Sequence, residues 1–151
     1  MRIDRVTAGA LLCLLVAGCD PFAALSQNDD RVVPDGDGPK VTLFSPHRRL
    51  PKSATNIHVH FENALDSEME ARFDAPINDA RAFLRAMVGH NGVPCTIDYG
   101  LYPSIAPPGP RPANSICGGD EQHHNDGRYA IDVDILPRGT AATVLVRTFT
   151  T

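Results

Sequence analysis

Apolar and polar residues alternate with a period of two in four stretches of the chain. This period is typical of strands with one buried and one solvated face, and several such strands favour an antiparallel sheet. The apolar positions of the four stretches are Ile57, Val59 and Phe61; Met69, Ala71 and Phe73; Tyr129, Ile131, Val133 and Ile135; and Ala142, Val144 and Val146. The pattern therefore predicts four strands.

Between the second and third stretches the period changes to that of a helix. Pro76 suits the first turn of a helix, Asp79 favours its positive end, and Gly89 can end it in the left-handed conformation. The apolar stripe at helical spacing is Ala80, Phe83, Leu84, Met87 and Val88. A single helix is therefore predicted between the two pairs of strands.

These elements predict an α+β fold in the order β-β-α-β-β. Pro137 and Gly139 suit a tight turn, so the last two strands are expected to form a hairpin. One helix against one face of a four-stranded antiparallel sheet is the natural two-layer arrangement. A long loop, about residues 90–127, precedes the third strand and contains a proline-rich run at 107–112. Because loops of this length are usually functional or disordered, it is the expected recognition surface.

Residues 6–16 form an uncharged apolar segment near the amino terminus. As a helix it would reach about 16 Å, half of a bilayer core of about 30 Å. This length is too short for a membrane span and is typical of the apolar region of a secretory signal peptide.

The residues that follow, Val16-Ala17-Gly18-Cys19, resemble the lipobox of bacterial prolipoproteins. The resemblance implies removal of residues 1–18 and attachment of fatty acids such as palmitate to the Cys19 thiol. An ordinary signal peptide or a buried apolar helix is the alternative. Asp20 resembles the signal by which enterobacterial lipoproteins stay in the inner membrane. The expected location is the cell membrane, lipid-anchored and facing the periplasm, with the inner membrane favoured over the outer.

Residues 19–52 are predicted to be the lipidated terminus and a flexible tether, because the runs at 26–30 and 34–39 are polar and rich in turn residues. The head domain is expected over 53–151. Its segments 50–57 and 72–76 resemble a pattern in uncharacterised small bacterial envelope proteins, a resemblance that supplies no activity.

Charge and cysteine usage narrow the classes of partner and compartment. The formal net charge of −4 becomes −5 once residues 1–18 are removed, so nucleic acid is not an expected partner and the lipid would have to provide the anchoring. Cys13 would leave with the signal peptide and Cys19 would carry lipid, which leaves Cys95 and Cys117 as a pair in an oxidising compartment. A disulfide between them is predicted.

Histidines offer a possible metal site. His58 and His60 share one face of a predicted strand, and His123 and His124 lie in the long loop. If that loop folded over the sheet, these four could bind zinc or copper. The alternative is that all four are solvent-facing, and no cofactor is expected.

Catalytic motifs are missing from the sequence. It contains neither a G-x-S-x-G nor an H-E-x-x-H pattern, and Asp132 and Asp134 are neighbours on one strand face rather than carboxylates across a cleft. We therefore expect a membrane-anchored, non-catalytic binding or structural module of the cell envelope with an envelope protein as partner. A lipoprotein that binds a metal or small ligand through its histidines, and an envelope hydrolase, remain the alternatives.

Overall fold

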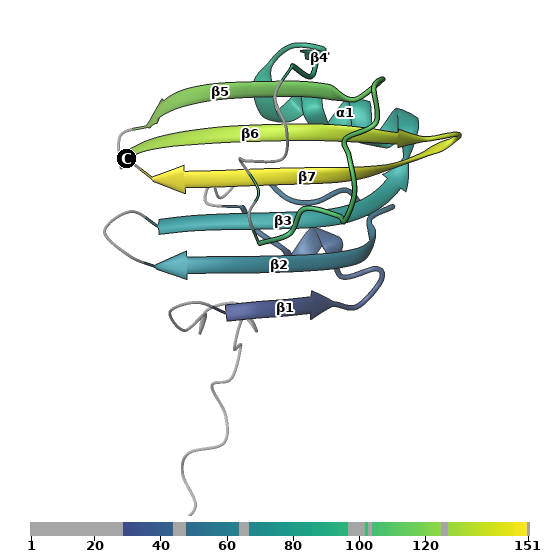
Figure 1. Cartoon of the computed structure of the whole chain (residues 1–151). Helices are drawn as coiled ribbons and strands as arrows, with labels where there is room; N and C mark the ends of the chain where they lie inside the picture. The colour runs from purple at the N-terminus through teal and green to yellow at the C-terminus, as the bar shows by residue number, and fades with distance from the viewer. Residues whose placement is uncertain are drawn as a thin grey trace, which may run out of the picture.

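A computed structural model gives the structure, which describes residues 29–43, 48–63, 67–96, 102, 104–124 and 127–150. Its main element is one seven-stranded sheet with the strand order β1-β2-β3-β7-β6-β5-β4 (Figure 1). All neighbouring strands are antiparallel. The elements are β1 (Asp29–Val33), the 3-10 helix η1 (Gly38–Lys40), β2 (Thr55–Asn63), β3 (Ser67–Pro76), α1 (Ile77–Val88), β4 (Val93–Pro94), β5 (Ile116–His124), β6 (Gly127–Arg138) and β7 (Ala141–Thr150).

The expected four-stranded α+β head is wrong, because the fold is mostly sheet and has three further strands. The four predicted strands became β2, β3, β6 and β7, and β1, β4 and β5 were missed. The β5 segment has the sequence ICGGDEQHH, in which two glycines and a polar run leave no apolar alternation. It is a strand because it pairs with β6 from Ile116 to His124, so part of the expected loop at 90–127 belongs to the sheet.

The predicted helix and hairpin are confirmed. α1 buries Ala80, Phe83, Leu84, Met87 and Val88, the apolar stripe that the sequence indicates. Gly89 follows the helix with φ 76° and donates its backbone N–H to the Arg85 carbonyl. β6 and β7 pair up to Arg138 and Ala141, on either side of the turn. Within the described residues, no helix is long and apolar enough to cross a membrane.

The first face of the sheet carries the main core, beneath α1 and the segment that joins β1 to β2. The Phe73 and Phe83 rings meet edge to face with centroids 5.3 Å apart. The connecting segment contributes Val41, Leu43 and Leu50, which are all buried. The folded part therefore begins by Asp29, inside the span expected to be a tether. The first part of that span, residues 19–28, lies outside the described residues, as do residues 44–47 and the lipobox with Cys19.

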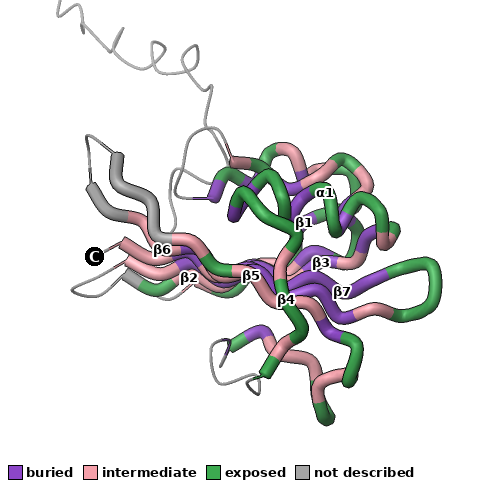
Figure 2. Tube along the Cα trace, turned by 90° about the horizontal axis from the view of Figure 1, so that it is seen from above, coloured by how far each residue is buried: buried purple, intermediate pink, exposed green. Residues whose placement is uncertain are grey.

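The second face of the sheet is covered in part by the described residues between 102 and 115, which we call the covering segment. Figure 2 shows the sheet edge-on, with α1 on one side and a separate stretch of chain on the other. Tyr102 and Ile105 pack there against Leu136 and Leu145, in a second apolar cluster separate from the main core. The sheet therefore has buried residues on both faces rather than on one.

The predicted disulfide between Cys95 and Cys117 is confirmed. Cys95 follows β4 and Cys117 lies on β5, with Cα atoms 5.0 Å apart and a sequence separation of 22 residues. The disulfide therefore fixes both ends of the chain that includes the covering segment.

We expect the double variant Cys95→Ala/Cys117→Ala to lose about 3 kcal/mol of unfolding free energy, because the open loop gains conformational entropy in the unfolded state. Urea denaturation measures the loss. A reducing agent should destabilise the natural chain by a similar amount and leave the double variant unchanged. Equal stability of oxidised and reduced natural protein would contradict the expectation.

Candidate functional site

A polar pocket of about 210 Å³ opens on the second face of the sheet. Pro107 and Pro108 of the covering segment form part of its wall. The polar side chains that line it are Asn56, His58, Arg72, Asp74, Arg138 and Thr143. They come from β2, β3, the end of β6 and β7, so sequence-distant elements build the pocket together.

Strand alternation explains why these polar groups meet. Ile57 and Phe73 are completely buried on the first face, so the side chains beside them in sequence lie on the second face. The register then sets His58 opposite Arg72 on neighbouring strands, and Asp74 opposite Thr143. The floor of the pocket thus follows directly from the pairing of β2, β3 and β7.

Asp74 is the centre of the hydrogen bonds in the pocket. The Thr143 hydroxyl donates to one carboxylate oxygen of Asp74 at 2.6 Å, and the Asn56 side-chain amide donates to the other at 3.1 Å. Thr143 is only 2% exposed. The carboxylate is therefore held in one orientation by groups from two other strands.

Asn56 has a strained backbone. Its φ of 54° is the only positive value of a non-glycine residue among those described, and it lies where the pairing of β2 with β3 shifts register between Thr55 and His58. Its backbone N–H donates to the Asp35 carboxylate at 2.9 Å. Strained residues and bulges concentrate at binding and active sites, where they aim a side chain. Here the bulge aims the Asn56 amide at Asp74.

Two hydrogen bonds attach the covering segment to β3 beside the pocket. Arg72 donates from Nη1 to the Ile105 carbonyl at 3.1 Å, and Glu70 accepts the Ser104 backbone N–H at 3.1 Å. Glu70 is 1% exposed and its second carboxylate oxygen has no hydrogen-bond partner. Burial raises the pKa of Glu70, the Ser104 N–H opposes that shift, and nearby Glu68 adds to it. The hydrogen bond from Ser104 therefore holds the Glu70 carboxylate in a buried position, where its negative charge is unfavourable.

A buried arginine fixes the other end of the covering segment. Arg111 Nη1 lies 2.5 Å from the Asp134 carboxylate, and both side chains are less than 8% exposed. The same nitrogen donates to Cys95 Sγ at 3.0 Å and to Cys117 Sγ at 3.1 Å. Burial raises the pKa of Asp134 although the hydrogen bond from Arg111 opposes it, and burial together with the charge on Asp134 raises the pKa of Tyr102. Ion pair and disulfide therefore form one cluster.

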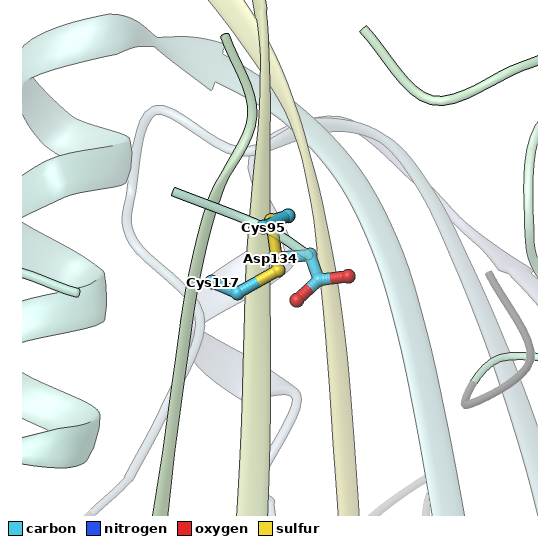
Figure 3. Close-up of side chains that lie close together, drawn as sticks. All are labelled: Cys95, Cys117 and Asp134. Atoms are coloured by element: carbon cyan, nitrogen blue, oxygen red, sulfur yellow. A yellow bond between two sulfur atoms is a disulfide. The ribbon is translucent and has the colours of Figure 1, made fainter. Parts of the chain in front are cut away.

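That cluster does not fit a metal ion. Cys95, Cys117 and Asp134, shown close together in Figure 3, form the one group of potential metal ligands within the described residues. The two cysteines are joined in a disulfide and have no free thiol, and the Asp134 carboxylate forms an ion pair with Arg111. Asp134 is also too buried, at 3% exposure, to act on a substrate as a hydrolase carboxylate.

The histidines considered for metal binding are spread over the sheet. His58 lines the pocket, whereas His60 Nδ1 lies 2.5 Å from the Asp30 carboxylate. His123 and His124 are on β5 and not in a loop, and their side chains lie outside the described residues. Three strands separate β2 from β5, which is about 19 Å at the usual strand spacing. One ion cannot bind all four residues.

Comparison of the chain with protein-family models, with curated proteins and with solved structures finds no match. The site therefore has to be interpreted from its own chemistry. Among the pocket residues, only His58 was singled out from the sequence as a candidate ligand. The shared face of Arg72 and Asp74 follows from the alternation in their strand, but the path that brings Pro107 and Pro108 over them has no local signal.

We expect Arg111→Met to lower the unfolding free energy by about 3–5 kcal/mol, because it leaves the Asp134 carboxylate buried without its cation. The double variant Arg111→Met/Asp134→Leu should recover most of that loss, since it removes both charges. Urea denaturation of the two single variants and the double variant gives the coupling energy. Additive losses would show that the two residues do not stabilise the fold as a pair.

Glu70→Gln should raise the thermal midpoint at neutral pH. Because the pKa of Glu70 is raised in the folded state, this residue favours folding at a pH below its ordinary value of 4.5, and the benefit is lost as the pH rises through the folded pKa. The advantage of the glutamine variant should therefore be largest at neutral pH and shrink as the solution is acidified. Thermal unfolding followed against pH tests this, with Glu62→Gln at an exposed position of β2 as the control. A constant difference at every pH would exclude titration of Glu70 as the cause.

Proposed function

We propose that this protein is a lipid-anchored, non-catalytic binding module that holds the polar pocket close to a membrane. The observation that carries the proposal is that the floor and the wall of the pocket are both held in place by other parts of the chain. Its floor consists of paired strands, and its wall belongs to a segment attached by the disulfide, by Arg111 and by the Glu70 and Arg72 hydrogen bonds.

A pocket with a fixed floor and wall supports binding because its residues need little further ordering when a ligand enters. Ordering side chains and loops at a site costs binding free energy, so a site whose wall is already fixed retains more of its contact energy. The strained Asn56 supports the same interpretation, since a strained backbone persists where the surrounding structure uses it.

The chemistry of the lining favours binding over catalysis. Thr143 supplies the hydroxyl among the lining residues. It donates a hydrogen bond to Asp74 and is only 2% exposed, so the hydroxyl is not directed at a substrate in the pocket. Activation of a hydroxyl nucleophile needs an adjacent base that orients it toward the substrate. The Thr143 and Asp74 pair lies within the strand floor, where its hydrogen bond holds β3 and β7 in register.

The anchor part of the proposal depends on the lipobox resemblance at Cys19. Only residues 20–28 separate that cysteine from the start of β1, so the chain makes ten residue steps from Cys19 to Asp29. Ten residues, fully extended, reach at most about 35 Å. The pocket would therefore stay near the membrane surface, where confinement raises the effective concentration of ligands or partners in the same layer.

Cys19→Ser should abolish incorporation of a palmitate analogue in bacterial cells and release the protein from the membrane fraction. Cys13→Ser is the matched control, because it removes a thiol from the segment that would be cleaved and should leave labelling intact. Labelling of the Cys19→Ser variant, or no labelling of the natural chain, would remove the anchor from the proposal.

For the pocket, a library of small polar compounds can be screened by nuclear magnetic resonance against the isotope-labelled chain carrying Cys19→Ser. We expect the compounds that bind to shift resonances of Asn56, Arg72 and Arg138. If they shift instead residues of the shallow groove beside β4, such as Val93 and Asn114, the binding site has been misplaced. If no compound shifts the lining residues, the pocket is not a binding site.

A further inference from the structure

We infer that the polar pocket binds a carboxylate group, held between the guanidinium groups of Arg72 and Arg138. The inference deepens the proposed binding function and rests on the same pocket. A small organic acid and the carboxyl end of a peptide chain present the same group, and the experiment below separates these two sources.

The balance of charge in the pocket favours a single negative charge on the ligand. Arg72 and Arg138 are cations, whereas Asp74 is the one acidic residue of the lining. With His58 neutral, the lining has a net charge of +1. A monoanion therefore neutralises the site.

Arg72 and Arg138 both have donors that can meet a ligand. The Arg72 guanidinium is fixed by its bond from Nη1 to the Ile105 carbonyl, which leaves four of its five N–H donors for other partners. The Arg138 side chain is exposed at the end of β6 and lines the pocket, and among the described residues this side chain has no hydrogen-bond or ion-pair partner. Planar guanidinium groups pair with carboxylates through two parallel hydrogen bonds. One fixed and one adjustable arginine thus suit a planar anion.

Asp74 discriminates against a phosphate. A phosphate monoester carries about −1.5 to −2 charges at neutral pH and would lie near the Asp74 carboxylate, which is held in place by Thr143 and Asn56. A carboxylate ligand carries only one negative charge, so Asp74 repels it less strongly than it repels a phosphate. Asp74 can also still accept a hydrogen bond, because an ionised carboxylate has about four acceptor positions and two are in use.

The proline wall and the volume limit what the carboxylate is attached to. Pro107 and Pro108 present apolar ring atoms, which suit a short aliphatic stem next to the charged group. The 210 Å³ of the pocket corresponds to about seven water molecules at about 30 Å³ each. The pocket therefore accommodates a small acid or the last residue of a chain.

The test uses the isotope-labelled chain carrying Cys19→Ser, titrated with sodium acetate, inorganic phosphate, and a tripeptide supplied as its free acid and as its C-terminal amide. We expect acetate and the free acid to shift the Arg72 and Arg138 resonances, the amide to leave them unchanged, and phosphate to bind more weakly than acetate. Arg138→Gln should weaken carboxylate binding by about twofold to fivefold, because one charged hydrogen-bond donor is lost at an exposed position.

Arg81→Gln is the matched control, since it removes the same charge from an exposed position on α1, which covers the opposite face of the sheet. It should leave the affinity unchanged. Equal weakening by Arg81→Gln would reduce the effect to general charge attraction and overturn the inference, as would equal binding of acid and amide. Tighter binding of the tripeptide acid than of acetate would identify a chain end as the source, and the reverse order a small acid.

The outcomes also separate this inference from the proposed function. If neutral or cationic compounds shift the pocket resonances and carboxylates do not, the pocket remains a binding site and the inference of a carboxylate is wrong. If nothing shifts them, both fail together.

Discussion

The ion pair between Arg111 and Asp134 is the interaction on which the second face of the sheet depends. A charged pair with both side chains less than 8% exposed is stable only when other groups satisfy its remaining hydrogen-bond capacity. Arg111 meets part of this need by also donating to both disulfide sulfurs. Burial raises the pKa of Tyr102, and the charge on nearby Asp134 adds to that rise. The covering segment is thus attached through charge and covalent linkage together, and the wall of the pocket follows from that attachment.

The elements that could be predicted from sequence are those whose own residues determine their state. β2, β3, β6 and β7 alternate clearly because each has one face toward the main core, and α1 carries a continuous apolar stripe. β5 could not be predicted, because its glycines at 118 and 119 and its polar end give no alternation of apolar and polar residues. Its strand geometry is imposed by pairing with β6, a contact that a local pattern does not encode.

The same distinction explains the segment expected to be a tether. Its turn residues, such as Pro34 and Gly36, are typical of a linker, yet Val41 and Leu43 beyond them are completely buried. Two apolar residues in a polar stretch are a weak signal. Their burial is favourable because they pack in the same core as the apolar face of β2 and β3. For the candidate site, the disulfide was predictable from cysteine counting, but the insertion of Arg111 beside it was not, because nothing local links that arginine to Asp134.

The β1 edge of the sheet affects how identical molecules behave at high local concentration. β1 is one edge strand, and it opens with Asp29, Asp30 and Arg31. An unpaired edge can join the edge of an identical neighbour, a reaction that grows with local density and leads to aggregation. Each β1 strand carries two acidic residues and one arginine, and Arg31 forms an ion pair with Asp29 of its own strand at 2.6 Å. Two aligned copies would therefore bring two strands of net negative charge together. The charges of β1 therefore help identical molecules to remain separate even when many copies lie close together.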